Sequence, residues 1–155
     1  MRKRIVTALL AVLLAAGCAG AEIVTLPESR YAVTLPEDMV SDGPTEGTGE
    51  AFARVSEAAG LEVSFFRFEG PEASLSARIA VLLEQGAEEL TMTTVNGVEM
   101  LVFRFPPEEE NGMPGIGYVF EDGDALQEIL FWYATPEAAE MTKTIMESIE
   151  GIETV

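Results

Sequence analysis

Residues 89–105, ELTMTTVNGVEMLVFRF, carry the clearest structural signal in the chain. Asn96-Gly97 stands between two runs that are rich in β-branched and aromatic residues, and this pair is favoured in two-residue type I′ hairpin turns. The pattern therefore predicts two antiparallel strands joined at Asn96-Gly97. A second hairpin is predicted further along the chain, with strands over 115–121 and 125–134 and a turn at about 122–124.

Two segments show the spacing of amphipathic helices. The first ends at Gly86, a C-terminal cap, and its apolar stripe consists of Leu75, Ile79, Leu82 and Leu83. The second begins with Thr135 as N-cap and Pro136 at the first helical position, and it is predicted to end near Gly151. Its predicted buried residues are Ala138, Met141, Ile145 and Ile149.

Shorter strands are predicted nearer the N-terminus. Residues 51–56 and 61–68 have the pattern of paired strands, and VTLPE occurs at 24–28 and 33–37, where a proline would end each of two short strands. The late strands are apolar on both faces, so their sheet needs a cover on each side. The sequence therefore predicts an α+β fold in which an antiparallel sheet carries one helix on each face.

Residues 1–21 predict a signal peptide, because Arg2, Lys3 and Arg4 precede a short apolar run. Two cleavage sites fit. Cleavage after Ala21 follows small residues and would leave residues 22–155 as a single secreted α+β domain. Cleavage before Cys18, in a stretch similar to a bacterial lipobox, would leave a membrane-anchored lipoprotein. The apolar run is shorter than the about 20 residues that span a bilayer, so no membrane-spanning segment is expected after processing.

Charge and composition exclude several functions. Residues 22–155 hold all 27 acidic residues and six of the nine basic ones, which gives a net charge of −21. A surface this acidic repels phosphate backbones, so nucleic acid is not an expected partner. The chain has no histidine, and its single cysteine is Cys18. Zinc sites built on His or Cys and nucleophile–histidine catalytic sets are therefore excluded in the mature domain.

Two segments resemble those of a known family. Residues 31–39, YAVTLPEDM, and 132–149, WYATPEAAEMTKTIMESI, are similar to the opening and closing segments of the Mog1/PsbP-like family, although the usual PEGW ending of the first is here Pro36-Glu37-Asp38-Met39. That family includes a nuclear Ran-binding protein, a photosystem II extrinsic subunit and bacterial lipoproteins. The resemblance implies an α/β/α sandwich and an accessory or interaction role, with no cofactor and no functional residue assigned to a position here.

Acidic loops offer one candidate site. Residues 106–115 and 121–128 could supply oxygen ligands for Ca²⁺, which takes six to eight of them, although the spacing is not that of an EF-hand. The candidate ligands are Glu108, Glu109, Glu110, Asp122 and Asp124. A plain solvated acidic loop is the alternative interpretation. A pair of carboxylates could also serve a hydrolase, but so many acids make such pairs by chance.

Aromatic residues offer a second candidate. Most are expected to fill the core under the helices, because they lie in strands of a two-sided sheet: Phe103, Phe105, Tyr118, Phe120, Phe131, Trp132 and Tyr133. Tyr31 and Trp132 each carry a polar group and are the candidates for an exposed interaction surface. Arg67 and Arg104 are expected to pair with carboxylates at the rim. Together these features predict an exported, non-enzymatic accessory domain of the bacterial envelope or extracellular space that binds another protein, with weak calcium binding as the alternative.

Overall fold

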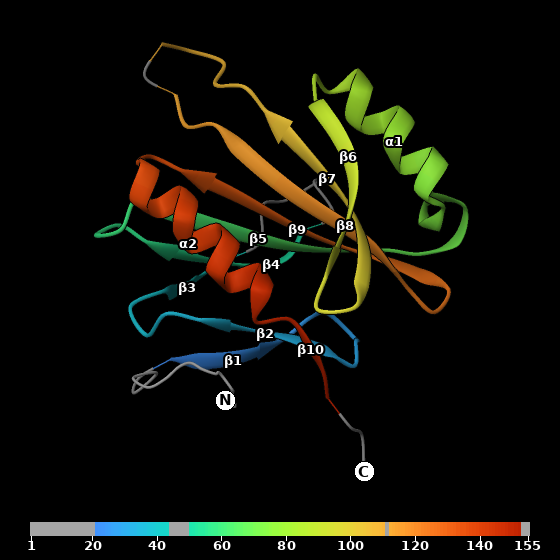
Figure 1. Ribbon diagram of the computed structural model, residues 1–155, viewed down its shortest axis with the longest axis horizontal. Coiled ribbons are helices and arrows are strands. Elements are labelled where there is room, and N and C mark those ends of the chain that lie inside the picture. The colour runs from blue at the N-terminus through green and yellow to red at the C-terminus, as the bar shows by residue number, and fades with distance from the viewer. Residues whose placement is uncertain (1–20, 44–49, 111, 153–155) are drawn as a thin grey trace.

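The computed structural model describes residues 21–43, 50–110 and 112–152, which form two antiparallel sheets and two α-helices (Figure 1). The larger described sheet has the strand order β3-β4-β5-β9-β8-β7-β6. Its strands are β3 (Val40–Asp42), β4 (Glu50–Ser56), β5 (Leu61–Phe68), β6 (Glu88–Val95), β7 (Val98–Phe105), β8 (Gly115–Asp122) and β9 (Ala125–Tyr133). The predicted signal peptide and Cys18 lie outside the described residues, apart from Ala21.

A second, smaller sheet corrects the expectation of a single one. It pairs β1 (Glu22–Thr25), β2 (Tyr31–Leu35) and β10 (Glu150–Gly151) in the order β1-β2-β10. The two VTLPE segments contribute to its first strands: β2 ends directly before Pro36 as predicted, whereas β1 ends at Thr25, two residues before Pro27. The end of the chain then returns to pair with β2, so β2 has a partner on each side and is not available to the larger sheet.

Both predicted hairpins are present. Asn96 and Gly97 have φ values of 51° and 81°, as a type I′ turn requires, and Val95 lies opposite Val98. The second turn joins β8 to β9, with Asp122 opposite Ala125.

Helix α2 begins where its cap predicts, and α1 also has a capping side chain at its start. Helix α1 (Leu75–Glu84) follows a 3₁₀ turn, η1 (Gly70–Ala73), and the Ser74 hydroxyl accepts a hydrogen bond from the Ala77 amide. Helix α2 (Pro136–Glu147) is capped by Thr135, whose hydroxyl accepts from the Ala138 amide. It ends before the predicted Gly151, because the residues after its cap leave the helix and pair with β2. No helix in the described segments is long and apolar enough to cross a membrane.

The core is divided between the two faces of the larger sheet. Along β9, Leu126, Leu130 and Trp132 pack into a cluster with α1 residues such as Leu82. The intervening residues Ile129, Phe131 and Tyr133 pack into another cluster with Ala138, Ile145 and Met146 of α2. Since neighbouring residues of a strand point to opposite faces, the two helices lie on opposite sides of this sheet (Figure 1). The fold is α+β, as predicted.

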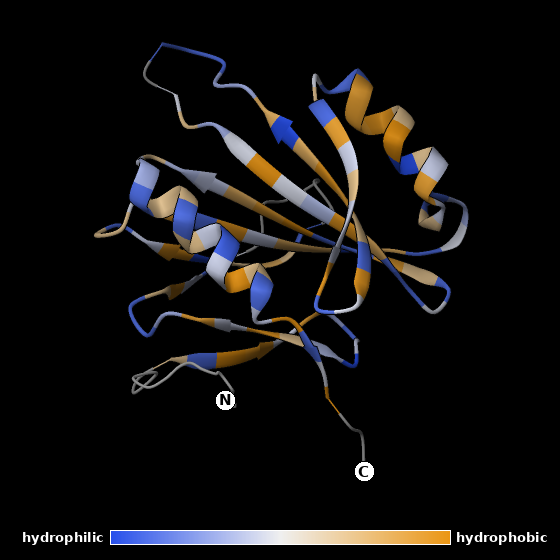
Figure 2. Ribbon diagram, viewed as in Figure 1, coloured by the Kyte–Doolittle hydropathy of each residue, from blue (hydrophilic) through white to orange (hydrophobic). Residues whose placement is uncertain are grey.

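The helical stripes differ in detail from the prediction. Leu83 is 57% exposed, because it lies about 100° around the helix from Leu82, which is fully buried. In α2, Thr142 and Met146 are buried whereas Met141 is only partly so. The Thr142 hydroxyl donates to the Ala139 carbonyl, so its burial leaves no polar group unpaired. Figure 2 shows the result: α1 is apolar over much of its length, while α2 alternates polar and apolar residues.

Gly117 explains how the aromatic residues fit. A Cβ atom at this position would lie 2.1 Å from Cζ of Phe103, so the fully buried Phe103 ring occupies the space that any other residue at 117 would need. The neighbouring strands β7 and β8 place Phe103 directly opposite Gly117. The glycine therefore makes room for a large side chain in the cluster under α1.

Candidate binding cleft

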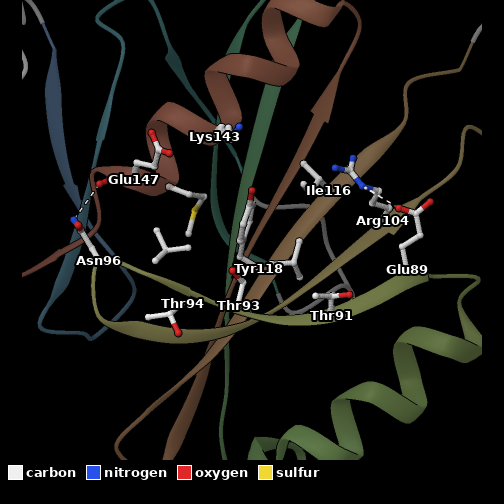
Figure 3. A pocket seen from close by; sticks show the side chains of 13 residues that line it. Glu89, Thr91, Thr93, Thr94, Asn96, Arg104, Ile116, Tyr118, Lys143 and Glu147 are labelled. Atoms are coloured by element: carbon white, nitrogen blue, oxygen red, sulfur yellow. Dashed lines mark hydrogen bonds and ion pairs between the residues drawn. The ribbon is translucent and has the colours of Figure 1, made fainter.

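An open cleft lies between α2 and the strands β6, β7 and β8, with a volume of about 780 Å³ (Figure 3). Its floor consists of Thr91, Thr93 and Val95 of β6, Val102 and Arg104 of β7, and Ile116 and Tyr118 of β8. Its wall consists of Lys143, Met146 and Glu147 of α2. The cleft exists because the main contacts of α2 are with β9 and β2, so that Thr91 and Thr93 of β6 remain exposed.

The sequence of β6 suits an uncovered floor. The side chains of Thr91, Thr93 and Val95 face the cleft. Leu90, on the same strand, packs into the α1 cluster on the other face of the sheet. Threonine is β-branched and favours strands, yet its hydroxyl remains well solvated where no helix covers it. The floor therefore offers hydroxyl groups that can donate or accept hydrogen bonds.

Tyr118 lies at the centre of this floor and is only 7% exposed. Its ring packs edge-to-face on Phe131 at 6.1 Å. Burial raises the pKa of Tyr118 above its ordinary value; Arg104 opposes this shift and Glu147 adds to it. Tyr118 therefore presents a neutral hydroxyl, and Figure 3 shows that its side chain points toward α2.

Two of the six basic residues of 22–155 line the cleft. Nε of Arg104 lies 3.4 Å from Oε1 of Glu89 in an exposed ion pair. Lys143 has no ion-pair partner among the residues that the structure describes. Because Glu147 lies on the same wall as Lys143, the cleft offers both charges to a ligand.

The hairpin turn closes one end of the cleft. Nδ2 of Asn96 donates to the backbone carbonyls of Glu147, at 3.0 Å, and Ile149, at 2.8 Å. Glu147 is the last residue of α2, where helix carbonyls lack partners within the helix, and Ile149 lies just beyond the C-cap. Asn96 thus serves two purposes, because it also adopts the positive φ of the turn.

The acidic loops do not come together. Glu108, Glu109 and Glu110 precede β8, whereas Asp122 and Asp124 lie at its far end. An eight-residue strand, roughly 25 Å long, lies between the two groups. In the described part of the chain, no group of three or more Asp, Glu, His or Cys side chains could hold a metal ion. Asp122 instead accepts a hydrogen bond from Gln127 and lies 3.8 Å from Arg67.

Tyr31 and Trp132 are each partly buried and belong to different faces. The Tyr31 ring packs edge-to-face on Phe120 at 5.2 Å. Trp132 stacks on Phe105 at 5.8 Å on the α1 side of the sheet. The structure therefore does not join the two residues in one surface.

Arg67 and Arg104 both pair with carboxylates, as predicted, since Nε of Arg67 lies 2.8 Å from Glu69. A third pair, Arg78–Glu128, was missed. The signal for it was Glu128 itself, an acid in the middle of an apolar strand, since a buried charge requires a partner.

Solved structures match this chain in fold, at low sequence identity. No protein-family model and no curated protein matches the chain. A crystal structure from Bacteroides thetaiotaomicron is 13% identical with a TM-score of 0.62, and the match covers 86% of this chain and 49% of that one. This chain thus spans about half of the Bacteroides chain. The solution structure of cyanobacterial PsbP (CyanoP) from Synechocystis sp. PCC 6803 is 12% identical with a TM-score of 0.63, and the match covers 90% and 98% of the two chains. The chain therefore has a PsbP/Mog1-like fold.

Proposed function

We propose that residues 22–155 form an exported accessory domain that binds another protein in the cleft beside α2 and performs no chemistry on it. The observation that carries this proposal is the cleft itself. Its volume of about 780 Å³ falls within the range of about 300–1,000 Å³ that is usual for ligand sites. Its hydroxyls, mixed charges and apolar side chains suit a polypeptide, which presents the same mixture of groups.

The chemistry of the cleft supports binding rather than catalysis. General acid–base catalysis works best with a group whose pKa lies near the working pH. Burial moves the pKa of Tyr118, at the centre of the cleft floor, upward and away from neutrality. Such a hydroxyl stays protonated at neutral pH, so it can donate a hydrogen bond but cannot serve as a general base.

Export rests on the N-terminal sequence. The charged and then apolar order of residues 2–16 supports cleavage by a signal peptidase, either after Ala21 or before Cys18. The intact mass of the protein recovered from cells that express the full chain tests this. A secreted product begins at Glu22, and a lipoprotein carries a diacylglyceryl group on Cys18. An uncleaved product would overturn the proposal of export.

Site-specific photo-crosslinking tests the binding role. A photoreactive p-benzoylphenylalanine at Thr93 in the cleft floor is expected to form a discrete adduct with one envelope or secreted protein. The same group at Thr144, which is exposed on α2 but does not line the cleft, is the matched control. No adduct from position 93, or equal adducts from both positions, would contradict cleft binding.

The absence of catalysis has its own test. Purified residues 22–155 are expected to leave a broad panel of hydrolase substrates unchanged. Turnover that either Tyr118→Phe or Glu147→Gln abolished would assign chemistry to the cleft and replace this proposal.

A further inference from the structure

Strand β6 forms one edge of the seven-stranded sheet, and no described strand pairs with its outer side. It has eight residues, most of them exposed, whereas β3 at the opposite edge has three. Long exposed edges offer a row of unpaired backbone groups to any extended chain.

The hairpin geometry identifies which groups point outward. In a type I′ turn the Val95 carbonyl accepts from the Val98 amide, so these two residues form a hydrogen-bonded pair. Hydrogen-bonded and non-bonded pairs alternate along an antiparallel ladder. The N–H and C=O groups of Met92 and Thr94 therefore point away from β7, toward the open side.

The edge lacks the features that usually prevent pairing. Residues 90–95, LTMTTV, contain no proline, no glycine and no charge, and four of the six are β-branched. Met92 is 47% exposed. The one irregularity is the register shift between Glu88 and Thr91, which lies outside the regular part of the strand.

We propose that β6 accepts an additional strand from a partner protein, namely an extended segment that carries lysine or arginine. This inference rests on the proposed function, which makes the domain a protein-binding module, and it names the kind of partner. Glu88 and Glu89 lie at one end of the edge and Glu99 lies opposite Thr94, so acidic side chains border it. A second copy of this chain is disfavoured, since both copies would carry a net charge of −21.

Strand addition also explains how the cleft would contribute to specificity. Side chains of an added strand alternate between the two faces of the sheet. Every second one would lie beside Thr91 and Thr93 on the cleft side, where the charged side chains are Glu89, Arg104, Lys143 and Glu147. Backbone hydrogen bonds would supply affinity, and the net charge of −21 together with Glu88, Glu89 and Glu99 beside the edge would favour basic residues in the added strand.

Synthetic peptides test this inference directly. The probe is an end-blocked, fluorescein-labelled octapeptide of alternating lysine and valine, measured by fluorescence anisotropy against residues 22–155. Two peptides are controls: one has glutamate in place of lysine, and the other keeps the lysines but carries an N-methyl group on every backbone amide, so that neither of its edges can donate a hydrogen bond. We expect each control to bind at least about tenfold more weakly, because one loses charge complementarity and the other loses backbone donors.

A matched pair of variants tests the edge from the protein side. Met92→Pro removes an outward N–H without removing a bond to β7, whereas Met92→Thr keeps that N–H. We expect about tenfold weaker peptide binding for the proline variant and little change for the threonine variant. Circular dichroism checks that both fold, and the N-methylated peptide decides the matter if Met92→Pro does not.

Three outcomes would overturn the inference: equal binding of the N-methylated peptide, unchanged binding by a folded Met92→Pro variant, or a dimer in sedimentation that Met92→Pro abolishes. Failure here is distinguishable from failure of the proposed function. A crosslinked partner at Thr93 without strand addition removes only the present inference, whereas the absence of any crosslinked partner removes the proposed function.

Discussion

Glu128 lies in the middle of β9, 1% exposed, and is held by a single partner from α1. Nε and Nη2 of Arg78 donate to its two carboxylate oxygens at 2.7 and 3.0 Å, and the Arg78 guanidinium lies 4.5 Å from the centre of the Phe68 ring. Burial raises the pKa of Glu128, and the hydrogen bonds and charge of Arg78 oppose this shift. The ion pair therefore attaches α1 to the sheet, and the buried Glu128 carboxylate depends on Arg78 as its partner.

Removal of Arg78 is expected to destabilise the domain strongly. Arg78→Met leaves Glu128 buried without a partner, which costs about 3–5 kcal/mol. Urea denaturation measures the loss. The double variant Arg78→Met with Glu128→Leu removes the buried charge as well and is expected to recover most of it. If the double variant were no more stable than the single one, lost packing and not the unpaired charge would be the cause.

The same pair predicts a dependence on pH. Since the folded pKa of Glu128 is raised above the ordinary 4.5, its contribution to stability is present below that pH and lost as the pH rises through the folded pKa. In Arg78→Met, Arg78 no longer opposes the upward shift of the Glu128 pKa, so the loss of folding stability continues to higher pH. We expect the stability gap between wild type and Arg78→Met to widen from pH 4.5 toward neutrality. A gap that does not change with pH would contradict this account.

At the scale of elements, Asn96 links the β6–β7 hairpin to the end of α2. Asn96→Gly keeps the positive φ but loses both side-chain hydrogen bonds, at about 0.5–1.5 kcal/mol each. Asn96→Asp is expected to destabilise more, because a carboxylate cannot donate and places negative charge at a helix C-terminus. Thermal unfolding of the two variants measures the order. If aspartate were tolerated better than glycine, the link to α2 would not contribute to stability.

Elements encoded by neighbouring residues were predicted well. The Asn96-Gly97 turn and the Thr135-Pro136 helix start depend on local backbone preferences, and the structure has both. The smaller sheet was not predicted, because it pairs β2 with a two-residue strand more than 100 positions away. The residues next to either strand carry no pattern that predicts a pairing over this separation in sequence.

The cleft was missed for a related reason. Its residues were visible as strand and helix positions, and Tyr118 was assigned to the core, where it largely lies. What periodicity could not show is that α2 leaves Thr91 and Thr93 of β6 exposed, since that depends on where the helix crosses the sheet. The second role of Asn96 was hidden for the same reason, because both of its acceptors lie on α2 or just beyond it.

At the scale of the whole molecule, the large negative net charge is expected to affect the stability of the folded domain. Residues 22–155 carry a net charge of −21, and self-repulsion of this kind opposes compact structure. The Debye length falls from about 30 Å at 0.01 M salt to about 8 Å at 0.15 M, so added salt weakens the repulsion. We expect sodium chloride in this range to raise the unfolding midpoint by a few degrees, since about 1 kcal/mol shifts a domain of this size by about 4 °C.

Two controls refine the salt experiment. Replacement of Glu108, Glu109 and Glu110 by glutamine is expected to raise the midpoint at low salt and to reduce the response. Calcium chloride at matched ionic strength is expected to act as sodium chloride does if the acidic loops are only solvated. A larger rise with calcium would favour the calcium-binding alternative, and a midpoint that fell with sodium chloride would contradict the charge argument.

The contacts of Asn96 also bear on which molecules the cleft can admit. At the hairpin end, the distance between floor and wall is set by two hydrogen bonds, and a thicker ligand would have to break both. At the Arg104 end, the lining side chains are exposed and can change rotamer. The width of the cleft is therefore fixed at the hairpin end, which admits only slender groups such as an extended backbone, and adjustable near Arg104, where bulkier groups can be accommodated.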